Sequence, residues 1–225
     1  MFAEKTFKKS AFVRVIRPIR VLKKQSLNER SRRAILLFIM LAGETTMSNL
    51  VPVNAQEDIF PEYRNTSVGR LLEYHNLSRD YETYAQAQLL VGMCMDNRKH
   101  LHIPDNFAYI IRAGGANLRY SEFKVSYAIA VGGVKSIALI GHNQCGMVNL
   151  AARKDLFIKG LVENAGWESE LAEQHFTHFA PMYEIVNEVD FVVSEAKRLR
   201  LRYPKIQVAP LLYKVEDTLL YQVRE

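Results

Sequence analysis

The fold is decided by the stretch Leu89-Leu-Val-Gly-Met-Cys-Met-Asp-Asn-Arg98 together with Ser136-Ile-Ala-Leu-Ile-Gly-His-Asn-Gln-Cys145. Each stretch begins with a short run that is almost wholly apolar and ends in polar or sulfur-bearing residues. Such a run, too short for a typical helix and rich in aliphatic side chains, is typical of a strand buried on both faces of a sheet. We therefore expect two buried strands, at residues 89–93 and 136–140, each followed directly by chemically capable side chains.

The segments around these two strands fit an alternating pattern of strands and helices. Further apolar runs predict three more strands, at residues 107–111, 206–213 and 219–223. Residues 122–131 predict a crossover helix that Gly132 ends. Apolar residues recur at three- and four-residue steps between Pro181 and Leu199, which predicts one long amphipathic helix with proline in its first turn. The sequence therefore predicts an α/β domain, with a central, mainly parallel sheet flanked by helices.

The charge is distributed unevenly along the chain. Residues 1–46 hold 11 Lys or Arg and 3 Asp or Glu, a net charge of +8. The other 179 residues hold 30 − 11 = 19 basic and 24 − 3 = 21 acidic groups, a net charge of −2. The excess positive charge thus belongs to the N-terminal segment, and we expect no nucleic-acid partner for the domain. The 48% hydrophobic and 24% charged content excludes a disordered or collagen-like chain.

Residues 1–46 have three interpretations. Arg32 and Arg33 precede the apolar run at residues 34–42, as in a secretory signal, but its nine residues are too few to cross a bilayer, which takes about 20. The segment could instead be a basic arm at a surface, or upstream sequence if translation begins at Met47. None of these three interpretations gives firm evidence for a membrane partner. We expect a folded domain at residues 47–225 in the cytoplasm, or an exported or organellar protein if the segment is a targeting signal.

The two cysteines and one histidine follow the strands expected at residues 89–93 and 136–140. Cys94 comes directly after the first strand, and His142 and Cys145 come after the second. In open α/β sheets, ligands bind beyond the carboxyl ends of the strands, so these three side chains can meet. Two thiolates and an imidazole suit Zn²⁺, and three protein ligands leave the open position of a catalytic site. The alternative is that both cysteines are small buried apolar residues.

These residues resemble the β-class carbonic anhydrases. That family carries Cys-x-Asp-x-Arg after one strand and His-x-x-Cys-Gly after a later one, matched here by Cys94-Met-Asp-Asn-Arg98 and His142-Asn-Gln-Cys-Gly146. The segment Arg112-Ala-Gly-Gly-Ala-Asn117 is similar to the family's Arg-Asn-Ala-Gly-type segment, and Leu212-Tyr-Lys-Val215 to its closing strand. The resemblance covers residues 89 to about 223.

The resemblance implies a function and a site. Cys94, His142 and Cys145 would be zinc ligands, and Asp96 with Arg98 would form a catalytic dyad for the reversible hydration of CO₂ to bicarbonate and a proton. Arg98 would hold the Asp96 carboxylate off the metal. The resemblance also implies N-terminal helices that embrace a partner subunit in a homodimer or larger homo-oligomer. The aromatic residues expected on these helices are Tyr63, Tyr74, Tyr81 and Tyr84.

Several alternatives stay open at the level of sequence. Relatives with the same ligand set hydrolyse CS₂ or COS, and a zinc-binding relative without catalysis is a further alternative. Asn97, Lys99, Asn143 and Gln144 stand where many family members have other residues. Asp96 and Arg98 could form an ordinary surface ion pair. Residues 147–152 predict a helix opened by Gly146, whose N-terminus would stabilise a Cys145 thiolate.

Overall fold

The computed structural model describes residues 49–225, which build one six-stranded sheet with strand order β1-β6-β5-β4-β2-β3. The strands are β1 (Leu50–Val51), β2 (Leu89–Met93), β3 (Ala108–Arg112), β4 (Ser136–His142), β5 (Gln207–Tyr213) and β6 (Leu220–Val223). Strands β3, β2, β4 and β5 pair in parallel, whereas β6 and β1 add antiparallel at one edge. All the predicted strands are present, and β4 continues as far as His142.

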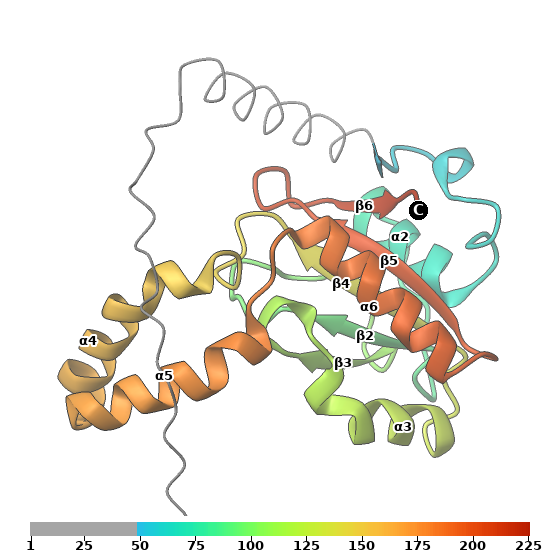
Figure 1. The fold of residues 1–225 in the computed structure, drawn as a ribbon. Helices are drawn as coiled ribbons and strands as arrows, with labels where there is room; N and C mark the ends of the chain where they lie inside the picture. The colour runs from blue at the N-terminus through green and yellow to red at the C-terminus, as the bar shows by residue number, and fades with distance from the viewer. Residues whose placement is uncertain (1–48) are drawn as a thin grey trace, which may run out of the picture. The chain divides into compact units, whose positions relative to one another are not determined.

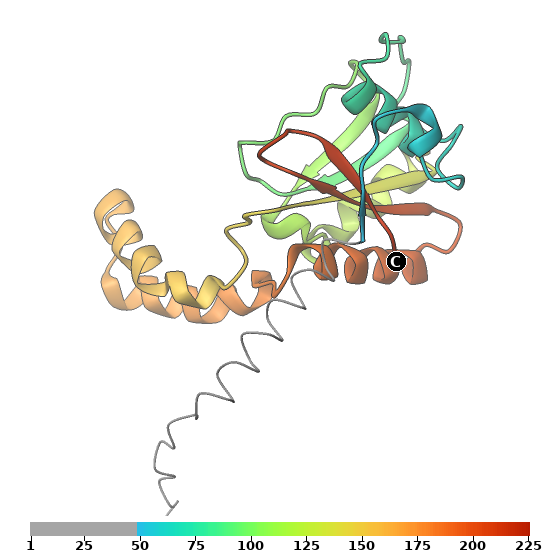
Figure 2. The same ribbon diagram turned by 90° about the horizontal axis from the view of Figure 1, so that it is seen from above.

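Helices cover both faces of this sheet (Figures 1 and 2). The helix α2 (Ser67–Leu77) packs on one face, and α3 (Glu122–Ala130) and α6 (Glu188–Arg202) pack on the other. The side chains of β2 divide between these layers, because successive residues of a strand point to opposite faces. Val91 belongs to the core under α2, while Leu90 belongs to the core under α3 and α6. The predicted α/β class, with a mainly parallel sheet flanked by helices, is confirmed.

Two further helices form a pair that extends away from the sheet (Figures 1 and 2). They are α4 (Lys154–Ala165) and α5 (Ser169–Tyr183), joined by a short turn at Gly166. Phe157 of α4 packs against Phe176 of α5, with ring centroids 5.1 Å apart. Residues 49–225 also contain the short 3₁₀ turns η1 (Gln56–Asp58), η2 (Gly114–Ala116), η3 (Arg119–Ser121) and η4 (Leu150–Arg153).

The prediction of one helix over residues 181–199 is wrong. Pro181 lies in the last turn of α5, and α6 begins only at Glu188. Asn187 caps α6, because its side chain accepts hydrogen bonds from the amides of Val189 and Asp190. Between the helices, the amide of Ile185 donates to the carbonyl of Met147 over 3.0 Å. This hydrogen bond joins the segment between α5 and α6 to the loop that follows β4.

The tyrosines expected on N-terminal helices are differently placed. Only Tyr74 lies on an α-helix, α2, whereas Tyr63 lies in a turn and Tyr81 and Tyr84 follow α2 outside any helix. The Tyr74 and Tyr84 rings pack on Phe107, with centroids 5.3 and 5.1 Å away. These aromatic side chains thus serve the core beside β3, and the embrace of a partner subunit stays a prediction.

The predictions for residues 1–46 fall outside the residues that the structure describes. Within residues 49–225, none of the helices combines the length and the apolar character that crossing a membrane requires.

Stability against acid should depend on His75. Its Nε2–H donates to the carbonyl of Thr218 over 2.9 Å, and its Nδ1 accepts from the His102 amide over 3.1 Å. The ring is therefore neutral, and burial lowers its pKa to about 4. The unfolded chain binds a proton near pH 6.5, so stability is complete above that pH and falls as the pH drops toward 4.

We expect His75→Gln to remove this acid sensitivity, which amounts to at most about 3 kcal/mol. Urea unfolding of both proteins between pH 7.5 and 4.5 measures it, with the exposed His178→Gln as control. An equal loss of stability for the wild type and His75→Gln over this interval would contradict the assignment.

Candidate metal centre

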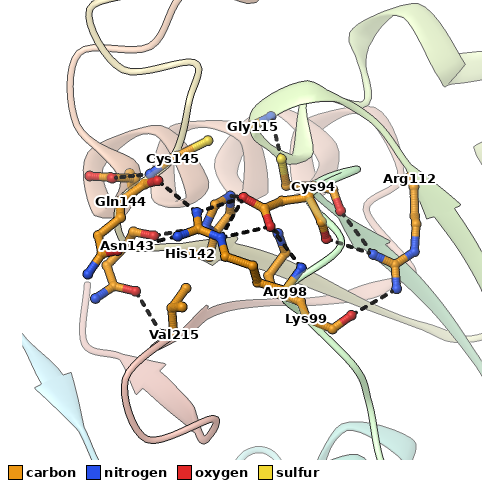
Figure 3. Close-up of polar contacts among 12 residues, drawn as sticks. Cys94, Arg98, Lys99, Arg112, Gly115, His142, Asn143, Gln144, Cys145 and Val215 are labelled. Carbon is orange, nitrogen blue, oxygen red and sulfur yellow. Dashed lines mark hydrogen bonds and ion pairs between the residues drawn. The ribbon is translucent and has the colours of Figure 1, made fainter.

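Three potential metal ligands meet at the carboxyl ends of β2 and β4. Cys94 follows β2 directly, His142 is the last residue of β4, and Cys145 lies in the loop after it. Their ligand atoms all lie within 4.8 Å of one another, and all three residues are buried. Figure 3 shows the three side chains at the junction of the two loops. The structure thus brings together residues that lie far apart in the sequence.

The imidazole of His142 is oriented so that one nitrogen is left free. Its Nδ1 lies 2.8 Å from the carbonyl oxygen of Asn143, which can only accept, so Nδ1 carries the proton. The other nitrogen, Nε2, is buried and has no hydrogen-bond partner among residues 49–225. A buried nitrogen lone pair beside two sulfur atoms is a donor set that suits Zn²⁺, and the backbone bond fixes the tautomer that a metal needs.

The two cysteines are placed to hold one negative charge between them. The proximity of the two sulfur atoms lowers the pKa of Cys94 and raises the pKa of Cys145, because one proton shared between them stabilises a single thiolate. The amide of Gly115 also donates to Cys94 Sγ over 3.3 Å. Gly115 reaches this position with a φ of 63°, a left-handed conformation that glycine adopts without strain. The pair therefore holds a thiolate readily.

The predicted helix opened by Gly146 is absent. Residues 146–149 form a turn, Asn149 has a left-handed φ of 52°, and only the 3₁₀ turn η4 follows. A single loop amide, that of Met147, takes the place of a helix N-terminus, and it only partly offsets the rise in the pKa of Cys145 that Cys94 and burial cause. The amide of Cys145 itself donates to Glu188 Oε1 over 3.1 Å. The sequence pattern did not single out Glu188, because it places this residue inside a helix over residues 181–199 and not at the start of α6.

Asp96 and Arg98 form an ion pair at the edge of this cluster. Arg98 Nη2 donates to Asp96 Oδ2 over 2.7 Å, and Arg98 Nε donates to Oδ1 over 3.0 Å. The Arg98 amide also donates to Oδ1 over 2.9 Å. These bonds hold the pKa of Asp96 well below its usual range, so the carboxylate is ionised. Its Oδ2 lies 4.0 Å from His142 Nε2.

Two arginines connect the loops that carry these groups. Arg98 Nη2 donates to the carbonyl of Gln144 over 3.1 Å, which joins the Asp96 loop to the loop of His142 and Cys145. Arg112 donates to the backbone carbonyls of Cys94 and Lys99 over 3.3 and 3.2 Å (Figure 3). Arg112 and Gln144 were noticed only as parts of a motif. Their roles as connectors between loops come from the folded geometry.

Solvent reaches the Asp96–Arg98 pair from one side. An open cavity of about 720 Å³ lies over it, lined by Met95, Asp96, Asn97, Arg98, Gln144, Gly146 and Arg153. On the inner side, Ile185 packs against both cysteines. The cluster thus lies between an apolar wall and an opening that carries two guanidinium groups, so a small molecule could reach it.

Comparison with known proteins finds solved structures that share this fold. No protein-family model and no curated protein matches the chain, whereas 66 chains of solved structures do. A β-carbonic anhydrase of Trichomonas vaginalis (isoform I) is 18% identical, with 66% of this chain and 90% of that chain covered and a TM-score of 0.52. A carbonic anhydrase of Glaciozyma antarctica is 21% identical, with 61% and 83% covered and a TM-score of 0.48. A carbon disulfide hydrolase is 20% identical, with 62% and 80% covered and a TM-score of 0.45.

We expect the protein to contain about one zinc per chain. Cys94→Ser, His142→Ala and Cys145→Ser should each lose most of it, because two ligands rarely retain Zn²⁺ against dialysis. Metal analysis by mass spectrometry after dialysis measures the content. His100→Ala, which changes an exposed histidine, serves as control. Full zinc content in all three cluster variants would overturn the assignment.

Proposed function

The chain has the fold of the β-carbonic anhydrases, and we propose that it is a zinc-dependent enzyme that hydrates CO₂ reversibly to bicarbonate and a proton. One observation carries this proposal. The buried Cys94–His142–Cys145 cluster lies beside an ionised carboxylate, Asp96, which an arginine holds in place. A site that only stabilised the fold would not need that carboxylate.

The ligand set suits zinc in both geometry and charge. Cys94, Cys145 and Nε2 of His142 would hold the ion, and two thiolates would balance its charge. When bound, zinc would supply the Lewis acidity that activates water at neutral pH. Thiolates of this kind persist in a reducing compartment, so we assign the protein to the cytoplasm.

Asp96 would orient the attacking hydroxyl. As an ionised carboxylate it can only accept hydrogen bonds, so the hydroxyl proton would point toward Asp96 and an oxygen lone pair toward the carbon of CO₂. Arg98 occupies both carboxylate oxygens and keeps the group in that position. Arg98 and Arg153 in the open cavity would attract the anionic product and a bicarbonate substrate in the reverse direction.

We also propose that the protein acts as a homodimer or larger homo-oligomer through the face formed by β3 and α3. The strand β3 lies at the edge of the sheet and exposes Tyr109 and Ile110. Beside it, Phe123, Tyr127 and Val131 follow at four-residue steps and are 81%, 53% and 67% exposed. An exposed apolar edge strand is a template for pairing, and a two-fold axis pairs such a face with itself.

We expect Tyr127→Lys to lower the mass that sedimentation equilibrium measures, because it places a charge in the centre of that face. Leu201→Lys serves as the matched control, since Leu201 is an exposed apolar residue of α6. Identical masses for the wild type and Tyr127→Lys would exclude this face as the interface.

Stopped-flow measurement of CO₂ hydration tests the proposed reaction on the zinc-loaded protein. The consumption of CS₂ and COS is assayed alongside, since a carbon disulfide hydrolase is among the similar structures. We expect kcat/KM for CO₂ to exceed that for either sulfur compound. In Arg98→Ala it should fall by roughly 10²- to 10³-fold, the usual effect of losing a preorganised charged group.

Arg153→Ala controls for the loss of a guanidinium from the same cavity and should have a much smaller effect. All proteins are compared at matched zinc content. Turnover of CS₂ or COS without CO₂ hydration would refute the proposed substrate. Equal kcat/KM for Arg98→Ala and the wild type would refute the role of the ion pair.

A further inference from the structure

The side chain of Lys99 is a buried charge that the proposed mechanism does not use. It is wholly buried, and its Nζ has no hydrogen-bond partner among the described residues. Lysine is almost never fully buried unless its charge has a partner, because an ammonium group loses its hydration on burial. A lysine in this position therefore requires an explanation from its charged neighbours.

Those neighbours belong to the candidate metal centre. The carboxylate beside it is that of Asp96, whose Oδ1 lies 3.9 Å from Lys99 Nζ. Burial lowers the pKa of Lys99, while Cys94, Asp96 and Cys145 act in the opposite direction and favour the charged form. Arg112 is the like charge nearby, and its guanidinium donates to the backbone carbonyl of Lys99 over 3.2 Å. The backbone of Lys99 is thus fixed, and its tip faces Asp96.

The two oxygens of Asp96 face different groups. Oδ2 lies 4.0 Å from His142 Nε2, so it faces the candidate metal centre. Oδ1 is the oxygen that faces Lys99, and it also accepts from the Arg98 amide. An attraction between Lys99 and Oδ1 therefore opposes a rotation of the carboxylate that carries Oδ1 away from Lys99.

Arg98 holds Asp96 from the side that is open to solvent. Its side chain is 42% exposed, whereas that of Lys99 is fully buried. Water and salt weaken an exposed ion pair, and such pairs often contribute little. Lys99 lies farther from the carboxylate, at 3.9 Å against 2.7 Å for Arg98, but the attraction of a buried charge is screened much less.

We propose that Lys99 is a positioning residue: a second, buried cation that holds Asp96 in its pair with Arg98 and off the metal. The inference rests on the proposed function, because it concerns the carboxylate that would orient the attacking hydroxyl. It also gives a role to Lys99, which stands where many β-class carbonic anhydrases have another side chain.

The test compares Lys99→Met with the wild type, since methionine retains much of the volume and removes the charge. The exposed Lys197→Met on α6 is the control for the loss of one positive charge elsewhere. In Lys99→Met we expect kcat/KM to fall about tenfold near pH 7 and to recover above about pH 9, because hydroxide then competes better with Asp96 for the fourth metal position. Lys197→Met should keep the wild-type profile.

A second measurement does not depend on activity. Crystal structures of the zinc-loaded wild type and Lys99→Met at pH 7 show whether Asp96 stays paired with Arg98. We expect the pair in the wild type and a carboxylate turned toward the metal in the variant. In the background of Asp96→Asn, Lys99→Met should leave the pH profile unchanged, because the partner charge is gone.

Three results would overturn the proposal. The first is a wild-type pH profile for Lys99→Met. The second is an equal loss of activity at every pH with the Asp96–Arg98 pair intact, which would show that Lys99 only fills space. The third is the failure of both Lys99→Met and Lys99→Gln to fold, which would show that the charge serves the fold. An inactive wild type would refute the proposed function alone, since the crystal structures would still decide the role of Lys99.

Discussion

The parallel pairing of β2 with β4 is the constraint from which the candidate site follows. Met93 lies opposite Ile140, so Cys94 and His142 leave the sheet at the same edge, and the next loop returns Cys145 to the same point. Three donor atoms then come within 4.8 Å although the chain separates them by a strand, a helix and several turns. A shift of one residue in this register would turn Cys94 or His142 to the other face and separate the donors.

Charge compensation around those donors explains most of the polar contacts in the two loops. A pair of cysteines that holds one thiolate readily and an ionised Asp96 lie close together in a partly buried region. Arg98 and Lys99 face these anions, and Arg112 fixes the backbone between them. The amides of Gly115 and Met147 stabilise the sulfur atoms locally. Carbon dioxide hydration, as we propose it, would use this arrangement to keep one carboxylate ionised and correctly oriented.

Much of this could be predicted from sequence, for identifiable reasons. The strands at residues 89–93 and 136–140 are almost wholly apolar and short, so their type and location were clear. The break between α5 and α6 was not, because Ile185 continues the apolar spacing of a helix although its side chain packs on Cys94 and Cys145. Gly146 preceded a helix-like run, but Asn149 adopts a left-handed conformation and interrupts it. Contacts such as Glu188 with Cys145, and Lys99 with Asp96, depend on how loops fold over each other, which no local pattern records.

The central claim is that Cys94, Cys145 and Nε2 of His142 hold a zinc ion. X-ray absorption at the zinc K edge tests it most directly, on the purified protein in solution. The account predicts two sulfur atoms at about 2.3 Å and two nitrogen or oxygen atoms at about 2.0 Å from the metal. A zinc surrounded only by nitrogen and oxygen, or by a single sulfur, would contradict it.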